Sequence, residues 1–134
     1  MKPLLAFITT IFFVAGSTGQ IIKYKAYEYT TIKQGQTTDP IWKETNLLVV
    51  FDVDEELIKV YGKEEHTFNF IKRNDCIAPD ENKFCVEYIA IDNNGEKATV
   101  TLMTSKIKTP QGKTLGVLTI GYKVTSTLYM LRTQ

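Results

Sequence analysis

The alternation of apolar and polar positions is clearest in residues 45–72, where it predicts three β-strands joined by two short polar turns. The first, residues 47–51, is continuously apolar and rich in β-branched and aromatic side chains. Such a run is typical of a strand near the middle of a sheet, covered on both faces. The other two strands follow at residues 57–61 and 66–72. Three strands this close together in the chain predict a meander.

The strand-like segment before them, residues 21–32, changes the side on which its apolar residues lie. At the start of the segment the apolar face consists of Ile22, Tyr24 and Ala26, and after that it consists of Tyr27 and Tyr29. One extra residue in a strand moves all later side chains to the opposite face, which is the effect of a β-bulge. The pattern therefore predicts a bulge or bend within this segment.

Two later segments flank the strongest hairpin signal in the chain. Residues 84–92 and 96–104 are strand-like, and Asn93-Asn94-Gly95 between them contains an Asn-Gly pair, which tolerates positive φ. A second turn region, residues 106–113, contains Pro110 and Gly112. Both turns favour short connections between antiparallel strands.

The alternation from Leu118 to Met130 is longer than an ordinary strand, at about 43 Å for roughly 3.3 Å per residue. A bend at Gly121 or Ser126, or two strands in succession, would explain this length. The segments together predict seven to eight antiparallel strands, and no stretch has a 3.6-residue period. The fold class is therefore all-β, and we expect a meander closed into a small, lipocalin-like barrel in preference to a two-layer sandwich.

The first nineteen residues have the pattern of a signal peptide. Lys2 is followed by an apolar core at residues 4–15 and by small residues up to Gly19. We expect cleavage near Gly19/Gln20, which leaves residues 20–134 as a single β-domain that is exported to the periplasm or secreted. The apolar core is too short to cross a bilayer, so no stable membrane insertion is expected after cleavage.

Charge and motifs exclude several function classes. Removal of Lys2 leaves fifteen basic and fifteen acidic residues, with no basic block, so a nucleic-acid partner is not expected. No glycine-rich phosphate loop is present, and we expect no cofactor.

The two cysteines, Cys76 and Cys85, predict a disulfide. In an exported chain thiols meet an oxidising environment, and this pair would close a loop between two strands. A metal site lacks further ligands nearby, and a redox pair would have a closer spacing.

Catalytic chemistry has little support in the sequence. The acidic residues 52–56 begin with the D-x-D spacing of many calcium loops, but Leu57 stands where such loops have glycine, so a solvated turn is preferred. A small hydrolase using Asp52, Asp54 or another carboxylate is a minor alternative. His66 is the only histidine and lies in no nucleophile motif, so we expect no enzyme.

Aromatic side chains are the remaining pointer to function. The chain has seven tyrosines, which provide contact area with a polar tip, although tyrosine is also a favoured strand residue. Tyr27, Tyr29 and Trp42 are the candidate ligand or partner contacts. Trp42 follows the polar, exposed segment 33–40, and its preferred role is to plug the core at the end of the sheet, with stacking against a ligand as the alternative.

Residues 42–45 (WKET), the strand runs LLVVFDVD and LIKVYGKEEHTFNFI, and the IDNNGE hairpin resemble a group of small exported β-rich proteins of uncharacterised function from gut-type Gram-negative bacteria. The resemblance covers most of residues 20–134 and implies the compartment and a compact β-fold. The Gly-x-Trp motif of lipocalins is absent, because position 40 is Pro.

These observations favour an exported, non-catalytic binding module. Its ligand would be a small molecule in the barrel mouth, or a protein bound through a tyrosine-rich face or loop. The alternative is a periplasmic inhibitor or accessory protein that inserts a loop, either residues 33–40 or residues 76–85, into a protein partner.

Overall fold

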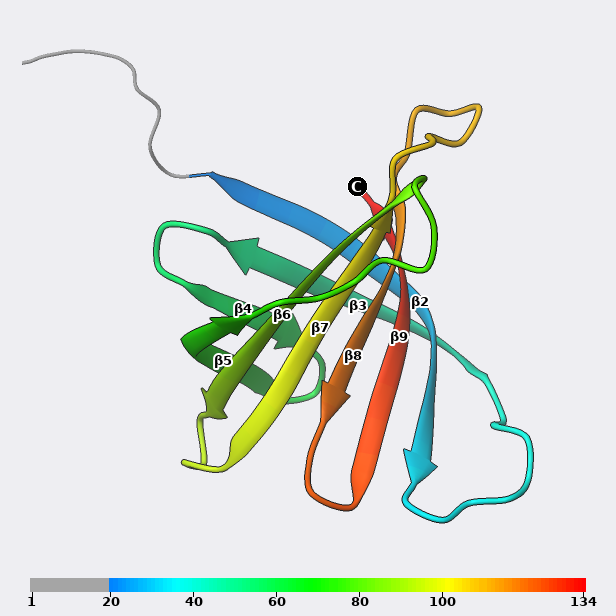
Figure 1. The fold of residues 1–134 in the computed structure, drawn as a ribbon. Helices are drawn as coiled ribbons and strands as arrows, with labels where there is room; N and C mark the ends of the chain where they lie inside the picture. The colour runs from blue at the N-terminus through cyan, green and yellow to red at the C-terminus, as the bar shows by residue number, and fades with distance from the viewer. Residues whose placement is uncertain (1–19) are drawn as a thin grey trace, which may run out of the picture.

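The computed structural model describes residues 20–134, so the expected signal peptide, residues 1–19, lies outside the described residues. Residues 20–134 form a closed barrel of antiparallel strands in meander order (Figure 1). The strands are β2 (Ile21–Lys33), β3 (Lys43–Asp52), β4 (Leu57–Tyr61), β5 (Glu65–Asn74), β6 (Lys83–Asp92), β7 (Lys97–Ser105), β8 (Leu115–Gly121) and β9 (Thr125–Thr133). The all-β barrel is therefore confirmed, and the sandwich is excluded.

Closure depends on the pairing of β2 with β9, the strands farthest apart in the described chain. β2 also pairs with β3, so both of its sides are hydrogen-bonded and the barrel has no free edge. The long alternating run at residues 118–130 divides between β8 and β9. Of the two explanations for its length, two successive strands is the correct one.

Alternate residues of every strand point into the barrel, where their side chains form one core. The core consists of Tyr24, Ala26, Val49, Phe51, Ile58, Val60, Phe68, Ala90, Ala98, Val100, Leu102, Leu118, Ile120 and Leu131.

The expectation that residues 47–51 are covered on both faces is wrong. Val49 and Phe51 are buried, but Leu48 and Val50 are only half-buried, because a closed barrel has no middle strand and no second layer outside β3.

The predicted bulge in β2 is confirmed. Its register shifts between Ala26 and Glu28 against both β3 and β9. Tyr27 and Tyr29 do not share a face, however. Tyr29 lies opposite Tyr129 on the inner face, whereas Tyr27 packs outside, with the Arg132 guanidinium 5.3 Å from its ring centroid. Tyr27 is itself the extra residue, so only the residues after it change side.

A second bulge, in β5, was not predicted. The register with β6 shifts between Phe70 and Lys72, so Ile71 is the extra residue. Residues opposite each other in an antiparallel pair lie on the same face. Arg73 lies opposite Tyr88, which in turn lies opposite the buried Val100, so the bulge places Arg73 rather than Lys72 on the inner face.

The predicted hairpin at residues 93–95 and the predicted disulfide are both confirmed. Gly95 has a φ of 83°, as an Asn-Gly turn requires, and its N–H donates to the carbonyl of Asp92 at 3.0 Å. Cys76 and Cys85 are bonded, with their Cα atoms 5.5 Å apart, and join the end of β5 to β6. Within residues 20–134 no helix is long and apolar enough to cross a membrane.

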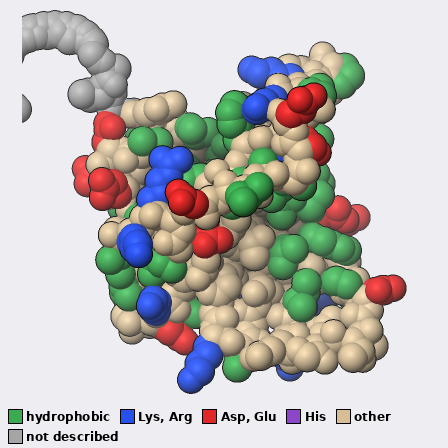
Figure 2. Space-filling view, viewed as in Figure 1, with side chains coloured by type: hydrophobic (Ala, Val, Ile, Leu, Met, Phe, Trp, Pro, Cys, Tyr) green, Lys and Arg blue, Asp and Glu red, His purple; other side chains and the backbone are tan. Residues whose placement is uncertain are grey.

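Successive turns of a meander fall at alternate ends of the barrel. We call one end the tyrosine end; it carries the turns β2–β3, β4–β5, β6–β7 and β8–β9. We call the other the disulfide end; it carries the turns β3–β4, β5–β6 and β7–β8. Figure 2 shows the disulfide end hollowed at the top of the view, between the start of β2 on one side and the projecting loops on the other.

Candidate functional site

An open cavity of about 560 Å³ lies at the tyrosine end of the barrel, and we call it the tyrosine mouth. It is lined by Tyr29, Thr45, Leu47, Val60, Gly62, Lys63, Glu64, His66 and Tyr129. The lining residues of β3, β5 and β9 continue the alternation of the buried core, as Thr45 and Leu47 do before Val49, and Tyr29 joins them after the bulge in β2. The tyrosine mouth is therefore the unfilled last layer of the barrel interior at the tyrosine end.

Two tyrosines from the strands that close the barrel form one wall. The rings of Tyr29 and Tyr129 are tilted by 31°, with centroids 6.3 Å apart. Burial raises the pKa of Tyr129, and the nearby Tyr29 raises it further. The phenol of Tyr129 is therefore held in its neutral form, able both to donate and to accept a hydrogen bond.

A buried carboxylate lies at the same end of the barrel. Asp92 is only 6% exposed, and its Oδ2 accepts a 2.8 Å hydrogen bond from the Tyr122 hydroxyl. Its Oδ1 accepts from the N–H groups of Glu96 at 2.8 Å and Asn94 at 2.9 Å. The Glu96 N–H makes the largest contribution to lowering the pKa of Asp92, and burial followed by the Asp92 hydrogen bond raises the pKa of Tyr122. One oxygen of this carboxylate holds the β6–β7 turn, and the other ties that turn to Tyr122 in the β8–β9 turn.

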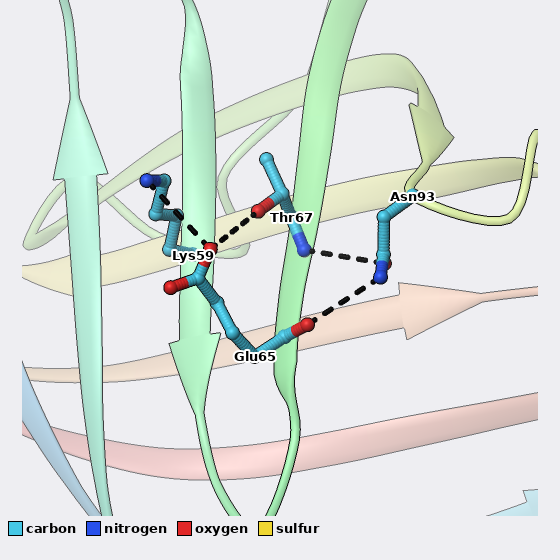
Figure 3. Close-up of polar contacts among 4 residues, drawn as sticks. All are labelled: Lys59, Glu65, Thr67 and Asn93. Atoms are coloured by element: carbon cyan, nitrogen blue, oxygen red, sulfur yellow. Dashed lines mark hydrogen bonds and ion pairs between the residues drawn. The ribbon is translucent and has the colours of Figure 1, made fainter.

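His66 reaches the tyrosine mouth from the start of β5, and Figure 3 shows how that segment is fixed. The Asn93 side chain accepts from the Thr67 N–H and donates to the Glu65 carbonyl, each at 3.4 Å. Its amide thus extends the β5–β6 ladder by one further pair. Glu65 also contacts Lys59, with Nζ and Oε2 3.8 Å apart, and accepts from the Thr67 hydroxyl at 3.4 Å. Glu65 and Thr67, the residues on either side of His66, are therefore held by Asn93, and Glu65 also by Lys59 on β4.

The three aromatic residues singled out from the sequence lie in different places. Only Tyr29 lines the tyrosine mouth; Tyr27 is on the outer surface under Arg132. Trp42 is 40% exposed just before β3, so the core-plug alternative is wrong. The exposed connection before it folds back against β2, where the Thr30 hydroxyl donates to the Ile41 carbonyl at 2.8 Å, and this leaves Trp42 beside the barrel rather than over its interior.

Sequence reasoning missed His66 and Tyr129 as lining residues. Tyr129 falls on the opposite side from Leu118 if residues 118–130 are read as one strand. In the structure Leu118 and Tyr129 are paired neighbours on adjacent strands and lie on the same face, because the turn between β8 and β9 intervenes. The sequence contains one indication for His66, because it lies two residues before Phe68 and so on the same face of the strand. Its place in the cavity wall depends on the pairing with the buried Val60.

The acidic residues 52–56 lie away from the tyrosine mouth, in the β3–β4 turn at the disulfide end. Asp52 Oδ1 accepts the Glu55 N–H at 3.1 Å, which is a local turn contact. Across residues 20–134, no group of three or more His, Cys, Asp or Glu side chains is placed to hold a metal ion.

Comparison with protein-family models, with curated proteins and with solved structures found no match for this chain. The resemblance to exported proteins of gut-type bacteria therefore stays a prediction. What the arrangement offers chemically is a concave wall of two phenols, a threonine hydroxyl and an imidazole above an apolar floor of Leu47 and Val60.

Proposed function

We propose that this protein is an exported, non-catalytic binding module that holds a small molecule in the tyrosine mouth. The observation that carries the proposal is the cavity of about 560 Å³ in the barrel interior, a size within the usual range of about 300 to 1,000 Å³ for small-molecule sites. The Cys76–Cys85 disulfide supports export, because structural disulfides persist in oxidising compartments.

The lining favours a neutral molecule that combines a flat apolar face with hydroxyl or amide groups. Tyr29 and Tyr129 provide ring faces and phenol groups, and Leu47 and Val60 provide apolar contact. The opposite charges of Lys63 and Glu64 stand together at the rim, so neither sign of ligand charge is selected by this turn.

The first experiment is native mass spectrometry of the protein purified without denaturant from the cells that produce it. We expect a bound small molecule of defined mass that is released on unfolding. A protein partner in place of a small molecule, or a homo-oligomer that carries no ligand, would overturn the proposal.

A matched pair of variants places the ligand. Leu47→Trp fills the tyrosine mouth, whereas Leu48→Trp adds the same ring on the outer face, opposite Lys25 and Tyr61. We expect the bound mass to be lost from Leu47→Trp and kept in Leu48→Trp, with circular dichroism confirming that both are folded. Retention of the ligand by folded Leu47→Trp would contradict the assignment.

The second candidate is a periplasmic inhibitor or accessory protein that acts through its loops. Ile77, within the disulfide loop, is 94% exposed, and Ile41 is exposed at the end of the connection between β2 and β3. Apolar side chains on projecting loops suit insertion into a protein partner. Under this alternative Ile77→Ser or Ile41→Ser abolishes partner capture in a pull-down, while Leu47→Trp leaves it intact.

A further inference from the structure

A second cavity, of about 370 Å³, opens at the disulfide end of the barrel, and we call it the arginine pocket. It is lined by Phe51, Val53, Glu56, Phe70, Ile71, Lys72, Arg73 and Tyr88. It lies at the end of the barrel that Figure 2 shows hollowed, and it shares no lining residue with the tyrosine mouth.

Three aromatic rings form the floor of the arginine pocket. Phe70 and Tyr88 are stacked, with centroids 3.9 Å apart and planes 5° apart. Phe51 is tilted against both, at 5.6 Å from Phe70 and 6.1 Å from Tyr88. The rings come from β3, β5 and β6. β5 pairs directly with β6, and β3 is joined to β5 through β4, so the strand ladders fix the floor before any ligand arrives.

Arg73 brings a positive charge to the lining beside this floor. The bulge at Ile71 places Arg73 on the inner face opposite Tyr88. The backbone beyond it is held by a 3.2 Å hydrogen bond from the Asn74 side chain to Glu87 and by the Cys76–Cys85 disulfide. Within residues 20–134 the Arg73 guanidinium forms no ion pair with a carboxylate.

The charge of the lining favours an anion. Lys72 and Arg73 outnumber Glu56, whose main role is structural: its carbonyl accepts the Phe70 N–H at 2.9 Å and thereby ties the β3–β4 turn to β5. Glu56 adopts a φ of 55°, an unusual conformation for a residue other than glycine. Ile71, 63% exposed, forms an apolar lip. An uncompensated guanidinium beside stacked rings suits a ligand with both a negative group and a flat ring.

We propose that the arginine pocket is a second binding site, and that its ligand is a small aromatic carboxylate. The ring packs against Phe70, Tyr88 and Phe51, and the carboxylate accepts two hydrogen bonds from the fork of Arg73. This site is separate from the tyrosine mouth and does not depend on the function proposed for it.

The test uses phenylacetate as the probe, with phenylacetamide and acetate as controls, followed by NMR of the labelled protein. We expect saturable shifts of the Tyr88 and Phe70 ring signals and of the Arg73 side-chain signal. Phenylacetamide lacks the charge and acetate lacks the ring, so each is expected to bind about tenfold more weakly or worse. Equal affinity for phenylacetate and phenylacetamide, or shifts confined to Tyr29, Tyr129 and His66, would overturn the proposal.

Arg73→Gln tests the guanidinium, and Arg132→Gln is the matched control because it removes the other arginine, which lies on the outer surface. We expect Arg73→Gln to weaken phenylacetate binding about tenfold and Arg132→Gln to leave it unchanged. Arg73 is exposed, so its replacement leaves the fold intact. Equal loss in both variants, or no loss in either, would contradict the site. Leu47→Trp is expected to leave phenylacetate binding unchanged, which separates this test from that of the tyrosine mouth.

Discussion

At the tyrosine end of the barrel, two phenols, a threonine and a histidine face an open cavity, whereas at the disulfide end three aromatic rings lie beside a guanidinium. Both cavities are bounded by the same kind of wall, antiparallel strands with alternate residues pointing inward. At each end a single bulge sets which side chain turns inward: Tyr29 after the bulge in β2, and Arg73 after the bulge in β5. The comparison teaches that one extra residue in a strand is enough to give the two ends of one small barrel different chemistry.

The ends also differ in how they are held. The tyrosine end depends on polar contacts around Asp92, and the disulfide end depends on a covalent bond and on the carbonyl of Glu56. Variants can therefore weaken one end and leave the other in place.

The largest effect is expected at Asp92. In Asp92→Ala the N–H groups of Asn94 and Glu96 and the hydroxyl of Tyr122 lose their acceptor, which should lower the free energy of unfolding by about 3 kcal/mol. Urea denaturation measures the loss, and hydrogen exchange should place it at the β6–β7 turn. A loss below about 1 kcal/mol would show that the carboxylate is not the main support of this end.

The same residue gives a pH dependence. The pKa of Asp92 is lower in the folded chain than in the unfolded chain, so the unfolded chain binds the proton first as the pH falls. The stabilisation is present above the ordinary aspartate pKa of about 4 and is lost as the pH falls through the lowered value. Asp92→Asn should therefore show a shallower decline in stability under acid than the unmodified protein, measured as unfolding midpoints across this range.

The second effect concerns the disulfide end. Replacing both Cys76 and Cys85 by Ser is expected to lower the free energy of unfolding by about 2 to 3 kcal/mol, because the unfolded chain regains the freedom of the closed loop. Phenylacetate binding should weaken with it, since Arg73 lies in the segment that the disulfide holds. Ligand retention by the tyrosine mouth serves as the control and should persist under conditions where the variant is folded.

The smallest effect is a gain in stability. Glu56→Gly removes the strain of a side chain in the left-handed conformation. Glycine also has greater freedom in the unfolded chain, which offsets part of this gain. The net rise in the free energy of unfolding should be about 0.5 to 1 kcal/mol. Glu55→Gly, one residue earlier in the same turn, is the control and should bring no gain. Removal of the Glu56 carboxylate should also strengthen phenylacetate binding, which a titration of the same variant measures.

The parts of the fold that local chemistry specifies were predictable from the sequence. The Asn-Gly hairpin, the disulfide, the acidic turn and the bulge near Tyr27 each depend on residues close together in the chain. The bulge at Ile71 gave no such signal. The chain runs from Phe70 and Ile71 to Lys72 and Arg73, two apolar residues and then two basic ones, so either phase of alternation fits.

The candidate site was less predictable because it is assembled from distant strands. Tyr29 was identified, but its partner Tyr129 depends on the pairing of β2 with β9, which no local pattern specifies. His66 was set aside as a lone histidine, since its catalytic signals are absent and its position in a cavity wall depends on pairing with β4. Trp42 was misplaced for a related reason: the loop before it turns back along the outside of β2.

The pairing of β2 with β9 also sets the order in which the molecule can be completed during synthesis. Thr31 and Thr127, whose hydroxyls lie 3.4 Å apart across this seam, are separated by 96 residues of sequence. A chain growing from its N-terminus can form the hairpins from β3 to β8 as they emerge, but β2 keeps one unpaired edge until β9 has been made. Since Tyr29 and Tyr129 stand on either side of this seam, the tyrosine mouth is the last part of the barrel to exist, and a nascent or prematurely terminated chain has no such cavity.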